Sequence, residues 1–306
     1  EWTHRFGLRE FTIKDKKYVL NGKPIYLKAA FFEGLYPNGI ANPDSEEMAR
    51  NEIRLAREAG FNMIRPWRRP PVPWWLDLAD EMGVLVVGSP ALECMALPLS
   101  TPHLPARVEN EIRQSVLRDR TRTSVVQWEL FNELHRPILM QMMRPMALMT
   151  RDLDATRLIL DESGGWAYGA NIYLPHEHEP TKFNDIHVYS GPFVDEGRYD
   201  GYLSIGMTDE EKEAFGFRGR TPGRNVVPGL MSYVSELGYG SLPNLPVVNA
   251  RFREEGNPLT PAYRFHHSVE ADQTRALARA GSAASIRILK RSSSSSSPST
   301  APPTSG

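Results

Sequence analysis

The chain has 306 residues with 36 basic and 37 acidic side chains, and its net charge of −1 predicts no general attraction to nucleic acid or to anionic membranes. Hydrophobic residues make up 41% of the sequence, enough for the core of one large domain or two ordinary ones. A single cysteine, Cys94, excludes an internal disulfide framework, and no apolar run reaches the roughly 18 residues that a membrane-spanning helix needs. Compartment and oligomeric state are left open.

The first predicted element is a β-hairpin. In the segment YVLNGKPIYLKAA, Asn21 and Gly22 separate two runs of β-prone residues. An Asn-Gly pair readily adopts the positive φ angles of a type I′ turn. We therefore predict a strand on either side of this pair.

Helices and short apolar runs then alternate along the chain. The segment DSEEMARNEIRLAREAG predicts a helix that is capped by Asp44 and stopped by Gly60. PWWLDLADEMG predicts a second helix that ends at Gly83. We expect a third helix from about residue 107 to 119, and a Met-rich fourth helix that is kinked or split at Pro145.

The apolar runs between these helices predict strands. They are continuous rather than alternating, which is typical of parallel strands that are buried on both faces. We therefore predict an α/β fold, a TIM (β/α)8 barrel over residues 24–265 that is incomplete at its eighth strand. A doubly wound sheet is the alternative, but no glycine-rich phosphate loop follows the first strand. The seven runs lie near residues 25, 63, 84, 125, 158, 186 and 231.

The end of the chain has a different composition. From Ser268 onward there is no aromatic residue, and Ala, Arg, Ser and Pro dominate. Such a segment cannot bury enough apolar surface to fold. We predict that residues 266–306 are a disordered, low-complexity tail of non-native character. SIRILK, at residues 285–290, is a weak candidate for the eighth strand.

Polar side chains gather where the predicted strands end. In a TIM barrel these carboxyl ends form the active site. Packing alone would not require polar groups there, so we expect the ends to form a catalytic or binding site. The residues concerned are Arg65, Trp67, Asn132, Glu133, Asp161, Glu162, His187, Tyr189, Ser235 and Glu236.

Two of these acids suggest a reaction. A pair of carboxyl groups, one protonated and one ionised, is the pattern of glycoside hydrolysis. Glu133 follows Trp128 and Phe131, whose apolar surroundings favour retention of its proton. Glu236 would be kept ionised by a cation, for which Arg65 is the candidate. Asp161 and Glu162 are expected to serve loop structure.

The motifs around these acids resemble those of glycoside hydrolase family 2, which includes β-galactosidases, β-glucuronidases and β-mannosidases. WELFNE at residues 128–133 resembles the acid/base motif of the family, and SELG at 235–238 resembles its nucleophile motif. GFNMIRPW resembles the second barrel strand. FGLREF followed by LNGKPIYLKAA resembles the junction between an immunoglobulin-like domain and the barrel. This resemblance implies that residues 1–23, with the hairpin, form the junction from a preceding β-sandwich domain.

The resemblance implies a retaining β-glycosidase that hydrolyses terminal β-linked sugars by double displacement. Glu133 would act as general acid and then as general base, and Glu236 as nucleophile, with their carboxyl groups about 5–5.5 Å apart. Arg65 and Tyr189 would hold Glu236 in place, and Asn132 would bind the sugar 2-hydroxyl. The further sugar contacts would be Trp67, Trp166 and His187. A carbohydrate is the implied partner, with no cofactor and no metal.

Two other functions compete with this one. A catalytically inactive, carbohydrate-binding barrel would share the same strand ends. A metal-dependent hydrolase could use the segment from His176 to Glu179, although its spacing is not that of the H-E-x-x-H motif. The Met residues near Pro145 are expected to fill the core.

Overall fold

The structure is a computed structural model, which describes residues 6–275 except 37, 68, 91, 93–101, 190–194, 239–243, 262, 266, 272 and 273. The chain divides into two compact units, each described by itself. The first unit comprises residues 1–189 and 195–237, and the second comprises residues 190–194 and 238–306.

The first unit begins with a small antiparallel sheet of β1 (Phe11–Lys14), β2 (Lys17–Leu20) and β3 (Lys23–Ile25). The turn between β2 and β3 contains Asn21 and Gly22, whose φ angles are 50° and 74°. The predicted hairpin is therefore confirmed. The strand that we predicted near residue 25 belongs to this small sheet and not to the barrel, because the Asn-Gly turn folds it back onto β2.

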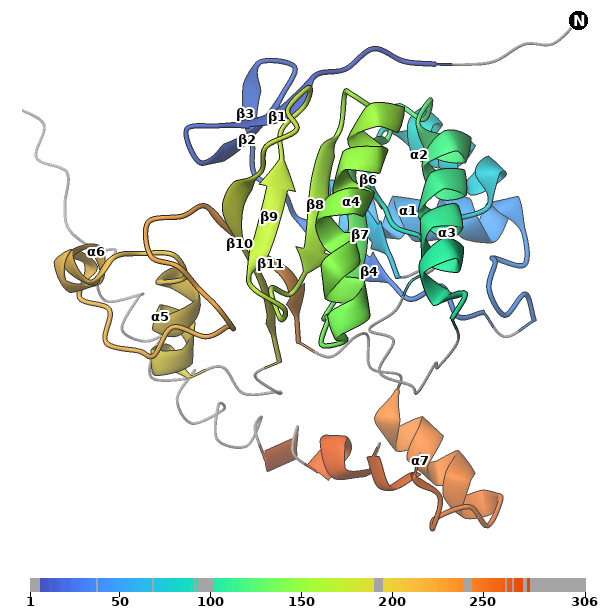
Figure 1. The fold of residues 1–306 in the computed structure, drawn as a ribbon. Coiled ribbons are helices and arrows are strands. Elements are labelled where there is room, and N and C mark those ends of the chain that lie inside the picture. The colour runs from blue at the N-terminus through green and yellow to red at the C-terminus, as the bar shows by residue number, and fades with distance from the viewer. Residues whose placement is uncertain are drawn as a thin grey trace, which may run out of the picture. The chain divides into compact units, whose positions relative to one another are not determined.

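An eight-stranded sheet forms the body of the first unit, in the order β11-β10-β9-β8-β7-β6-β5-β4 (Figure 1). Neighbours from β4 to β8 pair in parallel, as do β10 and β11. This nearly closed sheet with intervening helices confirms the TIM-barrel prediction. Its strands are β4 (Ala29–Phe32), β5 (Met63–Pro66), β6 (Leu85–Gly88), β7 (Val125–Asn132), β8 (Leu158–Ser163), β9 (Ala170–Tyr173), β10 (Thr181–Val188) and β11 (Ser232–Leu237).

Two strands of this sheet, β4 and β9, were not predicted. β9 pairs antiparallel with both β8 and β10, so the parallel set comprises seven of the eight strands. Within the described residues, β4 and β11 are the two edges of the sheet. The candidate eighth strand at residues 285–290 and residues 276–306 of the predicted tail lie outside the described residues.

Two of the four predicted helices match closely in their ends. They are α1 (Glu46–Glu58) and α2 (Pro73–Met82), and α2 ends at Gly83 with a φ of 68°. The cap of α1 is Ser45 rather than Asp44. Ser45 has extended backbone angles and its side chain accepts a hydrogen bond from the Met48 N–H.

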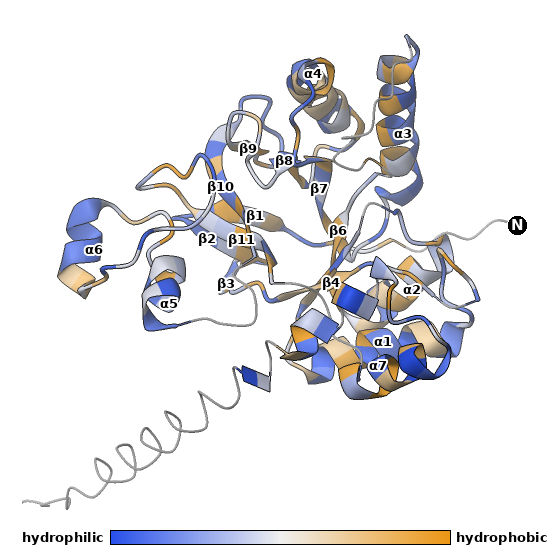
Figure 2. Ribbon diagram, turned by 90° about the horizontal axis from the view of Figure 1, so that it is seen from below, coloured by the Kyte–Doolittle hydropathy of each residue, from blue (hydrophilic) through white to orange (hydrophobic). Residues whose placement is uncertain are grey.

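The other two helices differ from prediction in their ends or continuity. α3 (Leu104–Asp119) begins three residues earlier than expected, with a proline in its first turn. α4 (Pro137–Leu153) runs through Pro145 as one helix rather than two. α3 and α4 lie side by side against the sheet (Figure 1), and hydrophobic and hydrophilic residues alternate along them (Figure 2).

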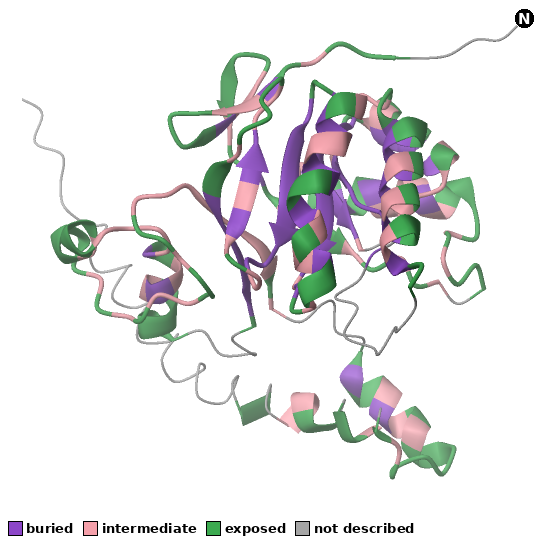
Figure 3. Cartoon of the chain, viewed as in Figure 1, coloured by how far each residue is buried: buried purple, intermediate pink, exposed green. Residues whose placement is uncertain are grey.

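Two hydrophobic clusters hold the sheet in place. The outer cluster joins α1 to α4 with the strands beneath them, and it includes Met143 and Met146 as core residues, as predicted. The inner cluster fills the barrel and includes Phe11 and Tyr18 of the small sheet. The strands are accordingly the most buried part of the unit (Figure 3).

Three shorter helices follow β10 in the chain. α5 (Glu196–Leu203) and α6 (Asp209–Phe215) lie in the chain between β10 and β11. In the second unit, α7 (Leu245–Glu254) is capped by Asn244, and Phe252 packs edge-on against Tyr263. No helix in the described ranges is both long enough and apolar enough to span a membrane.

Candidate active site

Glu133 occupies an unusual backbone position. It follows the fully buried strand β7 with a φ of 47°, in the left-handed region that a non-glycine residue enters only at a cost of about 1–2 kcal/mol. Its N–H donates to the carbonyl of Ser163 at 2.9 Å. Strained positions of this kind persist where the surrounding structure enforces them, which is common in functional sites.

The fold brings Glu133 and Glu236 together from distant parts of the sequence. A carboxylate oxygen of Glu133 and one of Glu236 lie within 4.8 Å of each other. The Glu133 side chain is 14% exposed and the Glu236 side chain is 10% exposed. Both acids stand at the carboxyl ends of their strands, as predicted for β7 and β11.

Arg65 and Tyr189 both contact Glu236. The Arg65 Nη1 donates to Oε1 of Glu236 at 2.6 Å, and the Tyr189 hydroxyl donates to Oε2. Burial opposes the charge of Arg65, but the carboxylates of Glu129 and Glu236 outweigh it and raise the pKa of Arg65 above its usual value. Arg65 therefore remains a cation that is paired with the carboxylates of both Glu129 and Glu236.

Glu129 is a functional neighbour that the sequence analysis missed. Both of its carboxylate oxygens accept from Arg65, at 2.7 and 2.8 Å, in a bidentate pair whose side chains are at most 3% exposed. An acid in the middle of an apolar strand needs a buried cation, and this signal could have been read from the WELFNE motif.

Asn132 lies beneath the two acids. It is fully buried, and its Oδ1 accepts from Nη2 of Arg65 at 3.1 Å. Asn132 and Glu129 therefore fix the guanidinium from one side while Glu236 binds it from the other.

His187 is placed against both acids. Its Nδ1 lies 2.7 Å from Oε1 of Glu133, and its Nε2 lies 3.5 Å from Oε1 of Glu236 and 2.9 Å from Oγ of Ser163. Asp185, two residues earlier on β10, is almost fully buried, and burial raises the pKa of its carboxyl group. Ser163 and Asp185 were not predicted as site residues.

The two predicted tryptophan contacts are both covered on one face by an arginine. The guanidinium of Arg65 lies over Trp67 at 5.4 Å from the ring centroid. The guanidinium of Arg224 lies over Trp166 at 3.9 Å, and the neighbouring Asn225 side chain donates to the carbonyl of Gly165. The contacts place the basic loop around residues 219–225 beside Trp166.

Asp161 and Glu162 bind backbone groups, as expected for residues that serve loop structure. Asp161 accepts from the N–H and the side chain of Asn171. Glu162 accepts from the N–H groups of Leu134 and Trp166. Burial raises the pKa of Asp161 to about 6 and that of Glu162 to about 7.

Among the described residues, one group of side chains could hold a metal ion. Glu133, His187 and Glu236 each offer a ligand atom within 4.8 Å of the others. However, the guanidinium of Arg65 already binds Glu236, and it would repel a second cation there.

The segment from His176 to Glu179 does not form such a group among the described residues. The His178 ring lies 3.0 Å from the Asp152 carboxylate, and Glu179 accepts from Arg144 at 2.8 Å; all four of these side chains are more than half exposed.

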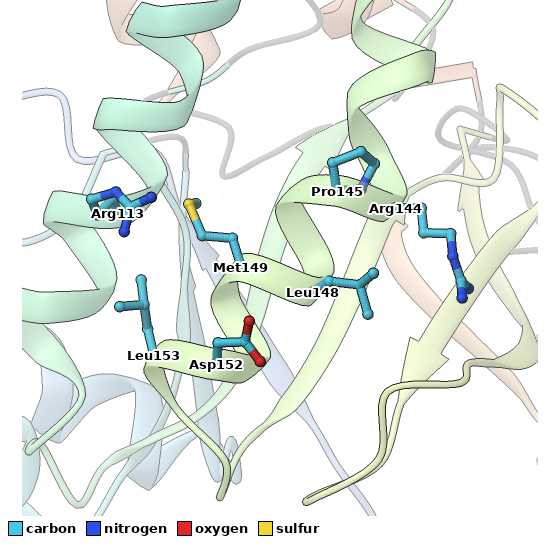
Figure 4. Close-up of a pocket in the computed structure, with 7 residues that line it drawn as sticks. All are labelled: Arg113, Arg144, Pro145, Leu148, Met149, Asp152 and Leu153. Carbon is cyan, nitrogen blue, oxygen red and sulfur yellow. The ribbon is translucent and has the colours of Figure 1, made fainter.

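A pocket of about 580 Å³ lies elsewhere, on the outer surface of α3 and α4 (Figure 4). None of its lining residues belongs to the predicted site. They are Arg113, Arg144, Pro145, Leu148, Met149, Asp152 and Leu153.

Fold and site together define a TIM-barrel protein with a carboxylate pair at the carboxyl ends of its strands. The family model for the TIM barrel domain of glycosyl hydrolases family 2 matches residues 11–187, more than half of the chain. The chain belongs to this family. Glu133 and His187 lie inside the matched segment, whereas Tyr189 and Glu236 follow it.

Named relatives agree with this family. The chain is 29% identical over 266 residues to a β-glucuronidase from Streptococcus agalactiae, covering 80% of the chain and 41% of the relative. It is 27% identical over 135 residues to a β-galactosidase from Photobacterium profundum, covering 42% of the chain and 13% of the relative. The chain thus spans less than half the length of these relatives.

Among solved structures, a β-glucuronidase from Parabacteroides merdae is similar to the chain with a TM-score of 0.45 and 26% identity. The similarity covers 51% of this chain and 21% of that one.

Proposed function

We propose that the chain carries the catalytic barrel of a retaining β-glycosidase, with Glu133 as the acid/base and Glu236 as the nucleophile. The observation that carries this proposal is the approach of their carboxylate oxygens to within 4.8 Å. Retaining enzymes hold their two carboxyl groups about 5–5.5 Å apart, whereas inverting enzymes leave room for a water molecule between them. Membership of glycosyl hydrolases family 2 supports the same reading.

The surroundings of the two acids suit these roles. In the first step Glu236 would attack the anomeric carbon while Glu133 protonates the departing oxygen. In the second step water would attack the anomeric carbon while Glu133 takes its proton, and the bond from that carbon to the Glu236 oxygen breaks to release the sugar. Arg65 and Tyr189 both bind Glu236, whereas Glu133 contacts the ring of His187. Terminal β-linked sugars are the proposed substrates, and contacts from Asn132, Trp67 and Trp166 remain predictions.

The proposal is tested with a panel of aryl β-glycosides that includes β-glucuronides and β-galactosides. We expect turnover by the unchanged chain, and a loss of 10²-fold or more in kcat in both Glu133→Gln and Glu236→Gln. The matched control is Glu58→Gln, an exposed acid on α1, which should keep full activity.

Azide distinguishes the two roles further. It should restore turnover of Glu236→Ala by attacking from the vacated face to give the α-glycosyl azide, and of Glu133→Ala to give the β-glycosyl azide. Sugar binding without turnover by the unchanged chain would contradict the proposal and favour a carbohydrate-binding barrel.

A further inference from the structure

Both ring nitrogens of His187 are engaged inside the barrel. Nδ1 lies 2.7 Å from Oε1 of Glu133, and Nε2 lies 2.9 Å from Oγ of Ser163. The imidazole itself is completely buried. Because a neutral imidazole donates from one nitrogen and accepts at the other, the partner of Nε2 decides what Nδ1 can do for Glu133.

The hydroxyl of Ser163 has one hydrogen and two lone pairs to distribute. Arg65 Nη2 lies 3.2 Å from this oxygen, and a guanidinium only donates, so it occupies one lone pair. Asp185 Oδ1 lies 3.1 Å away and accepts the hydroxyl hydrogen. Ser235 Oγ lies 3.3 Å away, and because it gives its own hydrogen to Asp185 it can only accept from Ser163. With the Ser163 hydrogen directed to Asp185 or Ser235, a lone pair faces Nε2 of His187, which donates in this arrangement.

Other contacts of the cluster agree with this direction. Asp185 Oδ1 also accepts from the Gly164 N–H at 2.7 Å and from the Ser235 hydroxyl, so it is an acceptor throughout. Glu236 Oε1 lies 3.5 Å from Nε2 and is a second acceptor beside it. Ser163 Oγ, Asp185 Oδ1 and Glu236 Oε1 can therefore each accept the hydrogen of Nε2.

We propose that Ser163 and Asp185 are positioning residues that fix His187 in its Nε2–H tautomer, so that Nδ1 accepts the hydrogen of Glu133 and keeps this carboxyl group protonated for the leaving group. The proposal rests on the proposed function for the use of that proton. In the glycosylation step the proton passes from Glu133 to the glycosidic oxygen, the bond from that oxygen to the anomeric carbon breaks, and Glu236 forms the new bond to carbon. The imidazole stays neutral and its hydrogen stays on Nε2.

Charges around the Glu133–His187 pair favour retention of this proton. Within the described residues, Arg65 is the cation that faces the pair, and its charge is shared between two carboxylates. Because Glu129 and Glu236 offset the charge of Arg65, this cation gives Glu133 little stabilisation in its ionised form. The groups that face the pair are Arg65 on β5, Glu129 on β7, Asp185 on β10, Tyr189 after β10 and Glu236 on β11.

The tautomer can be measured without any turnover. Protein carrying 15N-labelled histidine gives nitrogen shifts that separate the two neutral tautomers and the imidazolium, and the signals of His187 are those missing from His187→Gln. We expect the Nε2–H tautomer in the unchanged chain at neutral pH. A mixture of tautomers should appear in Ser163→Ala, which lacks the accepting oxygen.

An Nδ1–H tautomer or an imidazolium in the unchanged chain would overturn the proposal. So would a Ser163→Ala spectrum identical to that of the unchanged chain. These results stand whether or not the chain turns over a glycoside, so they are separate from a failure of the proposed function.

Kinetics supply the second readout. Phenyl glycosides need acid assistance to leave, whereas dinitrophenyl glycosides do not. In His187→Gln and Ser163→Ala we expect kcat/KM for the phenyl substrate to fall about 10-fold or more. The alkaline limb of its pH profile should move to lower pH by roughly one unit. The dinitrophenyl substrate should change less than about 2-fold in the glycosylation step.

If kcat/KM falls equally for both substrates, with a higher KM and no shift in the alkaline limb of the pH profile, His187 is a sugar contact instead. The matched control is His178→Gln, which replaces an exposed histidine that pairs with Asp152. It should leave the kinetics and the pH profile unchanged.

Discussion

Glu162 shows how a single buried acid couples the site loops to pH. Its Oε1 accepts from the N–H groups of Leu134 and Trp166, which ties the ends of β7 and β8 to their following loops. Hydrogen bonds of this kind favour the ionised form, but burial outweighs them and raises the pKa of Glu162 from 4.5 to about 7. The folded chain therefore holds this proton more tightly than the unfolded chain.

This difference predicts a pH dependence of stability. Because the folded-state pKa is the higher one, the stabilisation is complete below about pH 4.5 and is lost as pH rises through about 7. The total change from this residue is at most roughly 3 kcal/mol. Chemical denaturation across that range should show the free energy of unfolding falling with pH, and Glu162→Gln should reduce the slope. Asp161, whose pKa is raised to about 6 by burial, contributes in the same direction.

The control is Glu58→Gln on α1, where the acid is exposed and pairs with Arg54. It should leave the slope as it is. If Glu162→Gln has the same slope as the unchanged chain, burial does not raise the pKa of Glu162.

At the scale of an element, α1 shows how local chemistry chooses a helix boundary. Asp44 and Ser45 are both good capping residues. The Asp44 carboxylate accepts instead from the Gly39 N–H and the Asn38 side chain, which fixes the preceding loop. Ser45 then takes the extended conformation and caps the helix through Met48.

We expect Ser45→Ala to lower the free energy of unfolding by about 1 kcal/mol, because one N–H of the first turn loses its acceptor. Ser45→Asp, which restores an acceptor and adds a charge favourable to the helix N-terminus, should stay within about 0.5 kcal/mol of the unchanged chain. Denaturant unfolding measures both. Equal losses in the two variants would show that Ser45 does not act as the cap.

At the scale of the first unit, the small sheet and the site lie at opposite ends of the barrel. Phe11 stacks on Tyr18, and Tyr18 packs edge-on against Tyr233 near the start of β11. The inner cluster continues from these rings to Met63 and Leu158, the first residues of β5 and β8. The small sheet therefore closes the amino-terminal end, while Glu133 and Glu236 stand at the carboxyl end.

Weakening the packing of the small sheet against the barrel should lower the free energy of unfolding and leave kcat/KM unchanged. Phe11 is completely buried, so Phe11→Ala should lower the free energy of unfolding by about 3–5 kcal/mol. The control is Phe215→Ala, because Phe215 is 67% exposed. This substitution should lower the free energy of unfolding by about 0.5 kcal/mol or less. Below the unfolding transition, kcat/KM of folded Phe11→Ala should match that of the unchanged chain. A loss of activity without a loss of stability would contradict this separation of the two ends.

The sequence by itself determined the repeating pattern of the barrel. The pattern consists of continuous apolar runs, the Asn-Gly turn and the glycine after α2. These features depend on local periodicity and backbone preference, which are visible in the sequence itself. Polar residues at the ends of those runs likewise mark candidate site positions in the sequence, because no core requires them there. β9 escaped prediction because four residues between two loops carry no distinct period.

Only the tertiary structure decided how the marked residues meet. Glu133 and Glu236 lie a third of the chain apart, and their approach depends on the closure of the sheet rather than on either motif. The same closure buries Glu129 against Arg65 and places Ser163 and Asp185 around His187. These contacts join strands that are distant in sequence, and the direction of each hydrogen bond depends on all the partners present, so no local pattern could specify them.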